Sequence, residues 1–255
     1  MPTPFYHLVL AQDILHAETL NVDVRGLLLA ERPAFLFGNT APDVQALSGQ
    51  PREQTHFFSI HRADHSPPAQ QVMFSKYPEL AHARALPVQQ AAFVAGYCAH
   101  LLLDQAWITE IFHPVFGSNA RWSDLPERLF LHNVLRAHLD EHEYARLPVD
   151  IQDVLLATCP GFWLPFVQNE YMHRWRYFLA DQCAPGAAPR TVEVFAERMG
   201  RQPEEFETLL RSDNAIQLQI LSRMPARALE TFRQRGLVSS IALLNDYLVR
   251  DTERV

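Results

Sequence analysis

The chain has 255 residues, 48% of them hydrophobic and 20% charged, so we expect a folded globular protein large enough for a sizeable core. Its net charge of −7, with histidine neutral, disfavours nonspecific binding to nucleic acid, duplexes included, or to anionic membranes, because both need a basic protein surface. The 12 histidines instead suggest metal binding, because histidine is the commonest metal ligand in proteins.

Helical periodicity dominates the sequence and alternating β-branched runs are absent, so we predict an all-α fold, a multi-helix bundle. The predicted helices span residues 4–20, 23–31, 67–82, 88–112, 122–145, 149–157, 162–182, 190–199, 203–222 and 225–250. Residues 33–66 are rich in glycine and proline and are predicted to form a long loop, kept ordered by four phenylalanines.

A second break in the periodicity, CAPGAAPR at residues 183–190, has the composition of a linker. We therefore expect a main helical domain over residues 1–182 and a C-terminal helical extension over residues 190–255 that packs on it.

The cysteines and the N-terminal residues favour a cytoplasmic location. Cys98, Cys159 and Cys183 show no C-x-x-C spacing and no disulfide framework, as expected in a reducing compartment. The first 20 residues lack a basic start and carry Asp13 and Glu18, unlike a signal peptide. No run of about 18 or more uncharged apolar residues occurs, so no transmembrane segment is expected.

The stretch Ala91–Trp107, AAFVAGYCAHLLLDQAW, is predicted to form a buried helix that carries two polar side chains. His100 and Asp104 are four residues apart and so point to the same side of that helix. An unsatisfied buried polar group costs roughly 2–7 kcal/mol, so both need a partner. A shared metal ion and a mutual hydrogen bond are the two alternatives.

Three residues nearer the N-terminus are further candidates. His7 lies on the predicted core-facing stripe of the first helix, where a histidine is either a hydrogen-bonded core residue or a ligand. Asp43, in GNTAPD, occupies a position where turn aspartates are common, and His56, in QTHFF, is flanked by aromatic residues that could simply pack around it.

Taken in order, these pieces resemble the zinc-dependent phospholipase C family, which has an all-α fold and includes related single-strand nucleases. The matching pieces are FYHLVLAQ, FGNTAPD, THFF and FVAGYCAHLLLDQAW, and the resemblance covers roughly residues 4–145. The AHLLLD piece with its preceding Gly-Tyr is the most specific. The resemblance remains a motif hypothesis.

The resemblance implies a ligand set. Asp43, His56, His100 and Asp104 would surround one zinc ion, with Asp43 bridging to a neighbouring metal and Asp104 reaching another metal that takes His7. Asp43 and Asp104 would also be the catalytic residues, because a bridging carboxylate can orient the water that the metal activates.

The sequence departs from the family at the remaining ligands. Family enzymes with three zinc ions also use the amine of an N-terminal tryptophan, a further pair of histidines and an H-x-x-x-E motif, whereas this sequence starts Met1-Pro2-Thr3 and has no such motif downstream. Glu110, six residues after Asp104, and His132 are the candidates for the missing ligands. His132 is equally compatible with an ordinary charged helix surface. We therefore expect one or two zinc ions rather than three.

These expectations combine into a zinc-dependent hydrolase, a phosphodiesterase acting on a phospholipid-like or other small phosphoester through a metal-activated water. The alternative is a non-catalytic helical protein that keeps these side chains as a structural metal site or as a buried His–Asp network.

Overall fold

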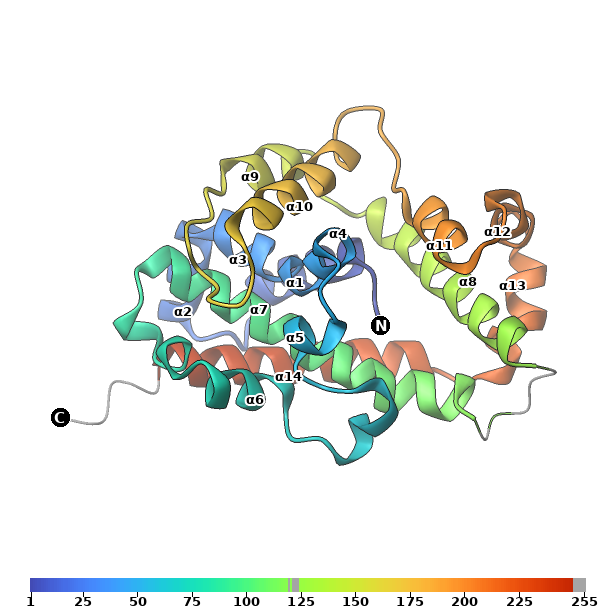
Figure 1. The fold of residues 1–255 in the computed structure, drawn as a ribbon, viewed down its shortest axis with the longest axis horizontal. Coiled ribbons are helices and arrows are strands. Elements are labelled where there is room, and N and C mark those ends of the chain that lie inside the picture. The colour runs from blue at the N-terminus through green and yellow to red at the C-terminus, as the bar shows by residue number, and fades with distance from the viewer. Residues whose placement is uncertain (119, 121–123, 250–255) are drawn as a thin grey trace.

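Helices are the regular structure of the described residues, which are 1–118, 120 and 124–249 of the computed structural model (Figure 1). The predicted all-α class is confirmed. The α-helices are α1 (Pro4–His16), α2 (Val22–Ala30), α3 (Arg32–Gly38), α4 (Gln45–Ser48), α5 (Arg52–His56), α6 (Ala69–Lys76), α7 (Val88–Trp107), α8 (Leu125–Tyr144), α9 (Ile151–Ala157), α10 (Asn169–Gln182), α11 (Thr191–Met199), α12 (Pro203–Leu210), α13 (Asp213–Gln219) and α14 (Ala228–Val249). The remaining helical segments are the 3₁₀ turns η1 (Ala41–Val44), η2 (Ile60–His65), η3 (Pro78–Leu80), η4 (Ala83–Ala85) and η6 (Leu221–Arg223), and the π-helix η5 (Ile108–Phe116).

Helix α7 is the centre of the molecule, and α3 crosses it in close contact. Two glycines allow this approach: a Cβ on Gly38 would lie 2.1 Å from the carbonyl oxygen of Phe93, and a Cβ on Gly96 would lie 2.3 Å from that of Phe35. No other residue fits at such separations. The crossing places the backbone just after α3 against the middle of α7.

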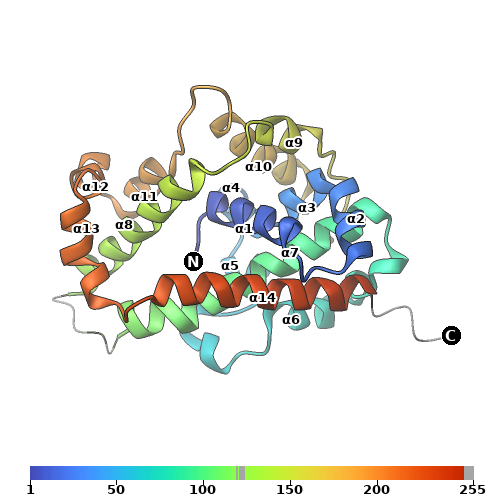
Figure 2. The same cartoon turned by 180° about the vertical axis from the view of Figure 1, so that it is seen from behind.

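Helix α14 runs along another side of α7, as the view from behind shows (Figure 2). The Phe232 ring packs edge-on against Trp107, with centroids 5.2 Å apart. A Cβ on Gly236 would lie 2.6 Å from Leu103 Cδ1, so this second crossing is also tight. Residues more than a hundred positions apart in sequence therefore share the hydrophobic core around α7.

Helices α11, α12 and α13 gather around the outer part of α8 (Figure 1). Phe206 of α12 packs edge-on against Phe130 of α8, with ring centroids 4.8 Å apart. The division of the chain after residue 182 stays a prediction; the described part of its C-terminal segment contains both these helices and the core helix α14.

Several predicted boundaries are wrong. Residues 33–66, predicted as a loop, hold α4, α5, two 3₁₀ turns and most of α3. These helices have seven residues or fewer, too short for an apolar repeat to show in the sequence. The helix predicted from residue 162 begins only at Asn169, and the one over 203–222 divides into α12, α13 and η6.

Other boundaries agree more closely. The break in helical structure predicted at residues 183–190 agrees with the structure, in which no helix lies between Gln182 and Thr191. Asp124 caps α8 by accepting a hydrogen bond from the Glu127 N–H at 2.7 Å. The predicted start of this helix at residues 122–123 and the predicted last residue of the final helix lie outside the described residues.

The sequence predicts no transmembrane segment, yet Val88–Phe116, which joins α7 to η5, is long and apolar enough to cross a membrane. In the structure, 83% of its most apolar window is buried inside the protein. Burial of that extent is what the core helix of a globular fold requires.

Candidate metal centre

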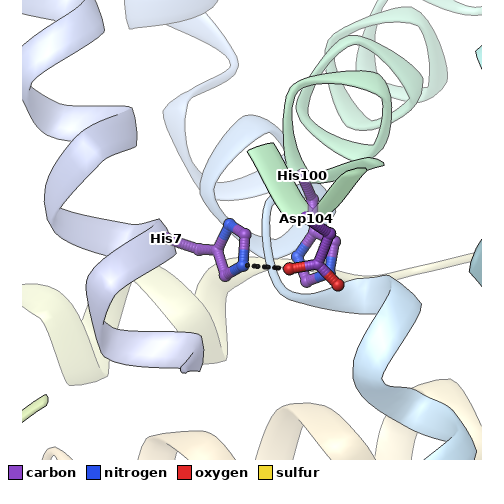
Figure 3. Close-up of side chains that lie close together, drawn as sticks. All are labelled: His7, His100 and Asp104. Atoms are coloured by element: carbon purple, nitrogen blue, oxygen red, sulfur yellow. Dashed lines mark ion pairs between the residues drawn. The ribbon is translucent and has the colours of Figure 1, made fainter. Parts of the chain in front are cut away.

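Four segments bring the five predicted ligands to one place. His7 comes from the second turn of α1, Asp43 from η1, and His56 from the last residue of α5. His100 and Asp104 lie one turn apart on α7 (Figure 3). The residues predicted from separate segments of the sequence therefore lie together, although α1 and α7 are far apart in the chain.

The Asp104 carboxylate is the point on which the histidines converge. Its Oδ1 lies 3.3 Å from His7 Nε2, the pair marked in Figure 3. Its Oδ2 lies 3.2 Å from His56 Nε2 and 3.5 Å from His100 Nε2. Asp43 Oδ1 completes the set at 3.6 Å from His56 Nε2. The two oxygens of Asp104 thus face different partners.

Two overlapping groups have ligand atoms that all lie within 4.8 Å of one another, the spacing that a bound metal ion requires. One is His7, His100 and Asp104; the other is Asp43, His56 and His100. The structure thus contains buried His/Asp groups that could hold a metal ion.

Hydrogen bonds at the far side of two rings fix which nitrogen carries the proton. His100 Nδ1 lies 2.8 Å from the Asn39 carbonyl oxygen, which only accepts, so Nδ1 donates. Thr55 Oγ1 donates to the Arg52 carbonyl oxygen at 3.2 Å and therefore accepts from His56 Nδ1 at 2.9 Å. In the neutral rings, Nε2 then presents a lone pair to the centre, the form in which histidine binds metal.

None of the three histidine Nε2 atoms has a hydrogen-bond partner in the described residues, nor does Asp104 Oδ1. Lone pairs of neutral rings facing carboxylate oxygens repel one another unless a cation lies between them. The cluster is therefore arranged for a cation, whether a metal ion or a proton.

Burial and charge oppose one another in setting the pKa values of this cluster. Burial, together with the nearby His100, lowers the pKa of His7 to about 4, so His7 is neutral at pH 7. Burial also acts against a charged His100, but the Asp104 carboxylate outweighs it and raises the pKa of His100. Burial acts against ionised Asp43 as well, yet His56 and the charge of His100 hold its pKa near 2. Both carboxylates are ionised at neutral pH.

The cluster is closed except at one edge. The side chains of His7, His56, His100 and Asp104 are 0–1% exposed, whereas Asp43 is 18% exposed. Of these five residues, Asp43 therefore marks the most accessible edge of the cluster.

The sequence predictions do not include Arg52, which belongs to the site. Its Nη2 donates to Asp104 Oδ2 at 2.9 Å, and its guanidinium lies over the Phe58 ring, 4.5 Å from the centroid. Its Nε and Nη1 are buried without a hydrogen-bond partner in the described residues. Arg52 and His56 are four residues apart and share a face of α5, a signal that becomes visible only once this segment is known to be helical.

Two further predicted ligands, Glu110 and His132, are not part of either group. His132 Nε2 instead accepts a hydrogen bond from Trp107 Nε1 at 3.0 Å. Glu110 lies 3.9 Å from Arg235 of α14. Even an unbroken α-helix would place Glu110, six residues after Asp104, about 240° around the helix axis from it. His132 lies on a different helix, α8.

Comparisons of the chain with protein-family models, with curated proteins and with solved structures found no match.

Proposed function

We propose that this protein is a zinc-dependent hydrolase of small phosphoric esters. One observation carries the proposal: the unpartnered Nε2 atoms of His7, His56 and His100 converge on the carboxylate of Asp104. The Nε2 atoms lie 3.2–3.5 Å from the Asp104 oxygens without a well-aligned hydrogen bond to them, so a metal ion could be held among these atoms.

The separations favour zinc. Zinc ligands of nitrogen and oxygen lie about 2.0–2.1 Å from the metal in a tetrahedron, whose edges are then about 3.3 Å. The nitrogen–oxygen separations around Asp104 are 3.2, 3.3 and 3.5 Å. Imidazole nitrogens and carboxylate oxygens are ordinary ligands of zinc. Because Asp104 presents its two oxygens to different histidines, one or two ions fit the set.

The residues around the cluster suit ester hydrolysis. Zinc would lower the pKa of a bound water and polarise a phosphoryl oxygen. Asp43, at the accessible edge, would orient the attacking water and accept its proton, while Asp104 would hold the histidines in register. Arg52, two of whose nitrogens have no hydrogen-bond partner among the described residues, would stabilise negative charge on a phosphoryl oxygen.

The substrate class follows from the resemblance to zinc-dependent phospholipases C and from the acidic balance of the chain. A phospholipid-like head group or another small phosphodiester fits both. A long polyanion is disfavoured by the net charge of −7.

The test combines metal analysis with turnover. Purified protein is analysed for metals, loaded with zinc, and assayed on bis(p-nitrophenyl) phosphate against a chelator-treated sample. We expect about one or two equivalents of zinc and hydrolysis that is lost on chelation and restored by zinc. A protein that cannot be loaded with zinc would rule the proposal out.

A second function is favoured by the closure of the cluster. With Arg52 paired to Asp104 and a raised pKa on His100, a proton can serve as the required cation, and the set then forms a buried polar network in a non-catalytic protein. A zinc-loaded protein that shows no hydrolysis of any phosphoester would favour a structural site.

A further inference from the structure

A cavity of about 400 Å³ lies beside the candidate metal centre, and Asp43 is part of its wall. Its lining residues come from α1, η1, α4, α8, α10 and α11 and from the residues just before α1 and α11. This volume is in the range of sites that bind small organic molecules. Since Asp43 is also the most exposed ligand of the cluster, the cavity and the centre share one residue.

Three arginines line the cavity: Arg136 of α8, Arg190 just before α11, and Arg198 of α11. None of them forms an ion pair with a carboxylate of the described residues, although Glu197 and Asp43 are also in the wall. Arg190 and Arg198 are exposed at its rim. Positive charge thus exceeds negative charge around the cavity, in a chain that is acidic overall.

Arg136 lies deeper than the other two. Its Nε donates to the Met1 carbonyl oxygen, its Nη1 donates to Asn133 Oδ1 at 2.8 Å, and its guanidinium lies over the Phe195 ring, 4.4 Å from the centroid. Burial lowers its pKa to about 10, which leaves it charged at neutral pH. These contacts hold a cation in place without neutralising it.

The rest of the wall is largely apolar. Its apolar lining includes Phe178 and Leu179 of α10, Val194 and Phe195 of α11, and Leu47 of α4. A ligand that only carried charge would leave this surface in contact with water, and a purely apolar ligand would leave the arginines without a partner. The wall therefore matches a molecule with both features.

We propose that this cavity binds the acidic, partly apolar portion of the substrate: a carboxylate or phosphate group contacted by the arginines, attached to an alkyl or aryl group that packs against α10 and α11. The inference rests on the proposed function, since it places the substrate's reacting phosphoester at Asp43 and its second anionic group in the cavity. A carboxylate ligand and a phosphate ligand would both be small organic anions, and the titrations below distinguish between them.

The test is calorimetric titration of the full chain with hexyl phosphate, hexanoate, inorganic phosphate and hexanol. We expect hexyl phosphate or hexanoate to bind at least about tenfold more tightly than inorganic phosphate or hexanol, because charge and apolar surface both contribute. The tighter of the two anions identifies the preferred acidic group.

A double variant, Arg190→Gln with Arg198→Gln, removes two exposed cations that make no ion pair, so we expect it to fold normally. It should weaken binding of the better anion by about tenfold or more. Arg211→Gln is the matched control, because Arg211 lies on the surface just after α12 and pairs with Glu207, and its loss should change the affinity less than about twofold.

Failure of both anions to bind, equal binding of hexanol, or an unchanged affinity in the double variant would overturn the inference. Zinc content measured on the same samples separates it from the proposed function. Zinc-loaded, active protein that ignores both anions refutes only the cavity, whereas anion binding by protein that cannot hold zinc refutes only the hydrolase.

Discussion

Arg52 Nη2 lies 2.9 Å from Asp104 Oδ2, so the carboxylate on which three histidines converge is already paired with a fixed positive charge. Neutralising Asp104 would leave a largely buried guanidinium without its partner. Loss of one member of a buried ion pair typically costs 3–5 kcal/mol. Arg52 is 14% exposed, which lets water reach it and reduces the penalty.

We therefore expect Asp104→Asn to lower the free energy of unfolding of the metal-free protein by about 3 kcal/mol. The double variant Asp104→Asn with Arg52→Gln should be less destabilised than the sum of its single variants, since the stranded charge is absent. Urea denaturation of the wild type, the two single variants and the double variant completes the double-mutant cycle. Additive losses would show that the pair contributes nothing to stability.

Asp43→Asn is a cleaner probe of metal binding. Asp43 is the most exposed of the five residues, and the described ion pair of Arg52 is with Asp104, so neutralising Asp43 leaves that pair in place. We expect zinc affinity and phosphodiester turnover each to fall by at least about 100-fold, since even residues that only orient a ligand contribute 10–100-fold. The free energy of unfolding of the metal-free protein should fall by about 2 kcal/mol, because the pKa near 2 means that the folded state favours the ionised Asp43 carboxylate.

Competition against a chromogenic chelator measures that affinity, and Asp181→Asn, an exposed change on α10, is the control. Retention of wild-type zinc affinity in the Asp43 variant would remove Asp43 from the ligand set.

Gly96→Ala tests the close crossing of α3 and α7. The added methyl group would lie 2.3 Å from the Phe35 carbonyl oxygen, so backbone must move, at a cost of about 3 kcal/mol. Gly26→Ala is the matched control, because a Cβ there meets nothing within 4 Å in helix α2, and it should stabilise the protein by roughly 0.5–1 kcal/mol. Thermal unfolding compares the two; equal effects would mean that the helices do not cross as described.

Asp140, which lies outside the candidate metal centre, should make the stability of the protein depend on pH. The Thr3 and Thr191 hydroxyls donate to its carboxylate, yet burial dominates and raises its pKa from 3.8 to about 7. The folded state therefore favours the protonated carboxyl. That contribution to stability is complete below about pH 4 and is lost as the pH rises towards about 7.

Asp140→Asn keeps the shape and removes the titration, so its stability relative to wild type should rise with pH by up to about 1.4 kcal/mol per unit across that window. Urea unfolding at several pH values measures the difference, with Asp181→Asn as the reference. A difference that stays flat with pH would contradict the raised pKa.

The sequence shows part of the candidate site directly. His100 and Asp104 are predictable together because a spacing of four residues on a long apolar helix places both on one side. Asp43 and His56 gain meaning only from their order along the chain. Arg52 is missed because its segment is predicted to be a loop. Glu110 lies outside both ligand groups because a spacing of six residues after Asp104 does not place two side chains on one side of a helix.

The elements of the fold also differ in how well the sequence predicts them. Long helices such as α7, α8 and α14 follow from their apolar repeat, whereas α3 is held by what it contacts. Its seven residues make few hydrogen bonds of their own, and its place is fixed by the close approach of Gly38 to Phe93. Such approaches depend on residues about sixty positions away, which no local pattern reports.

The packing of α14 along α7 has a consequence for biosynthesis. A ribosome releases the chain from its N-terminus, so α7 emerges about 120 residues before the helix that covers it. At translation rates of roughly 5–20 residues per second, its apolar side waits on the order of ten seconds for that cover. The nascent polypeptide therefore carries an uncovered hydrophobic surface beside its gathered histidines, which makes this interval the point in the protein's life when chaperones would matter most.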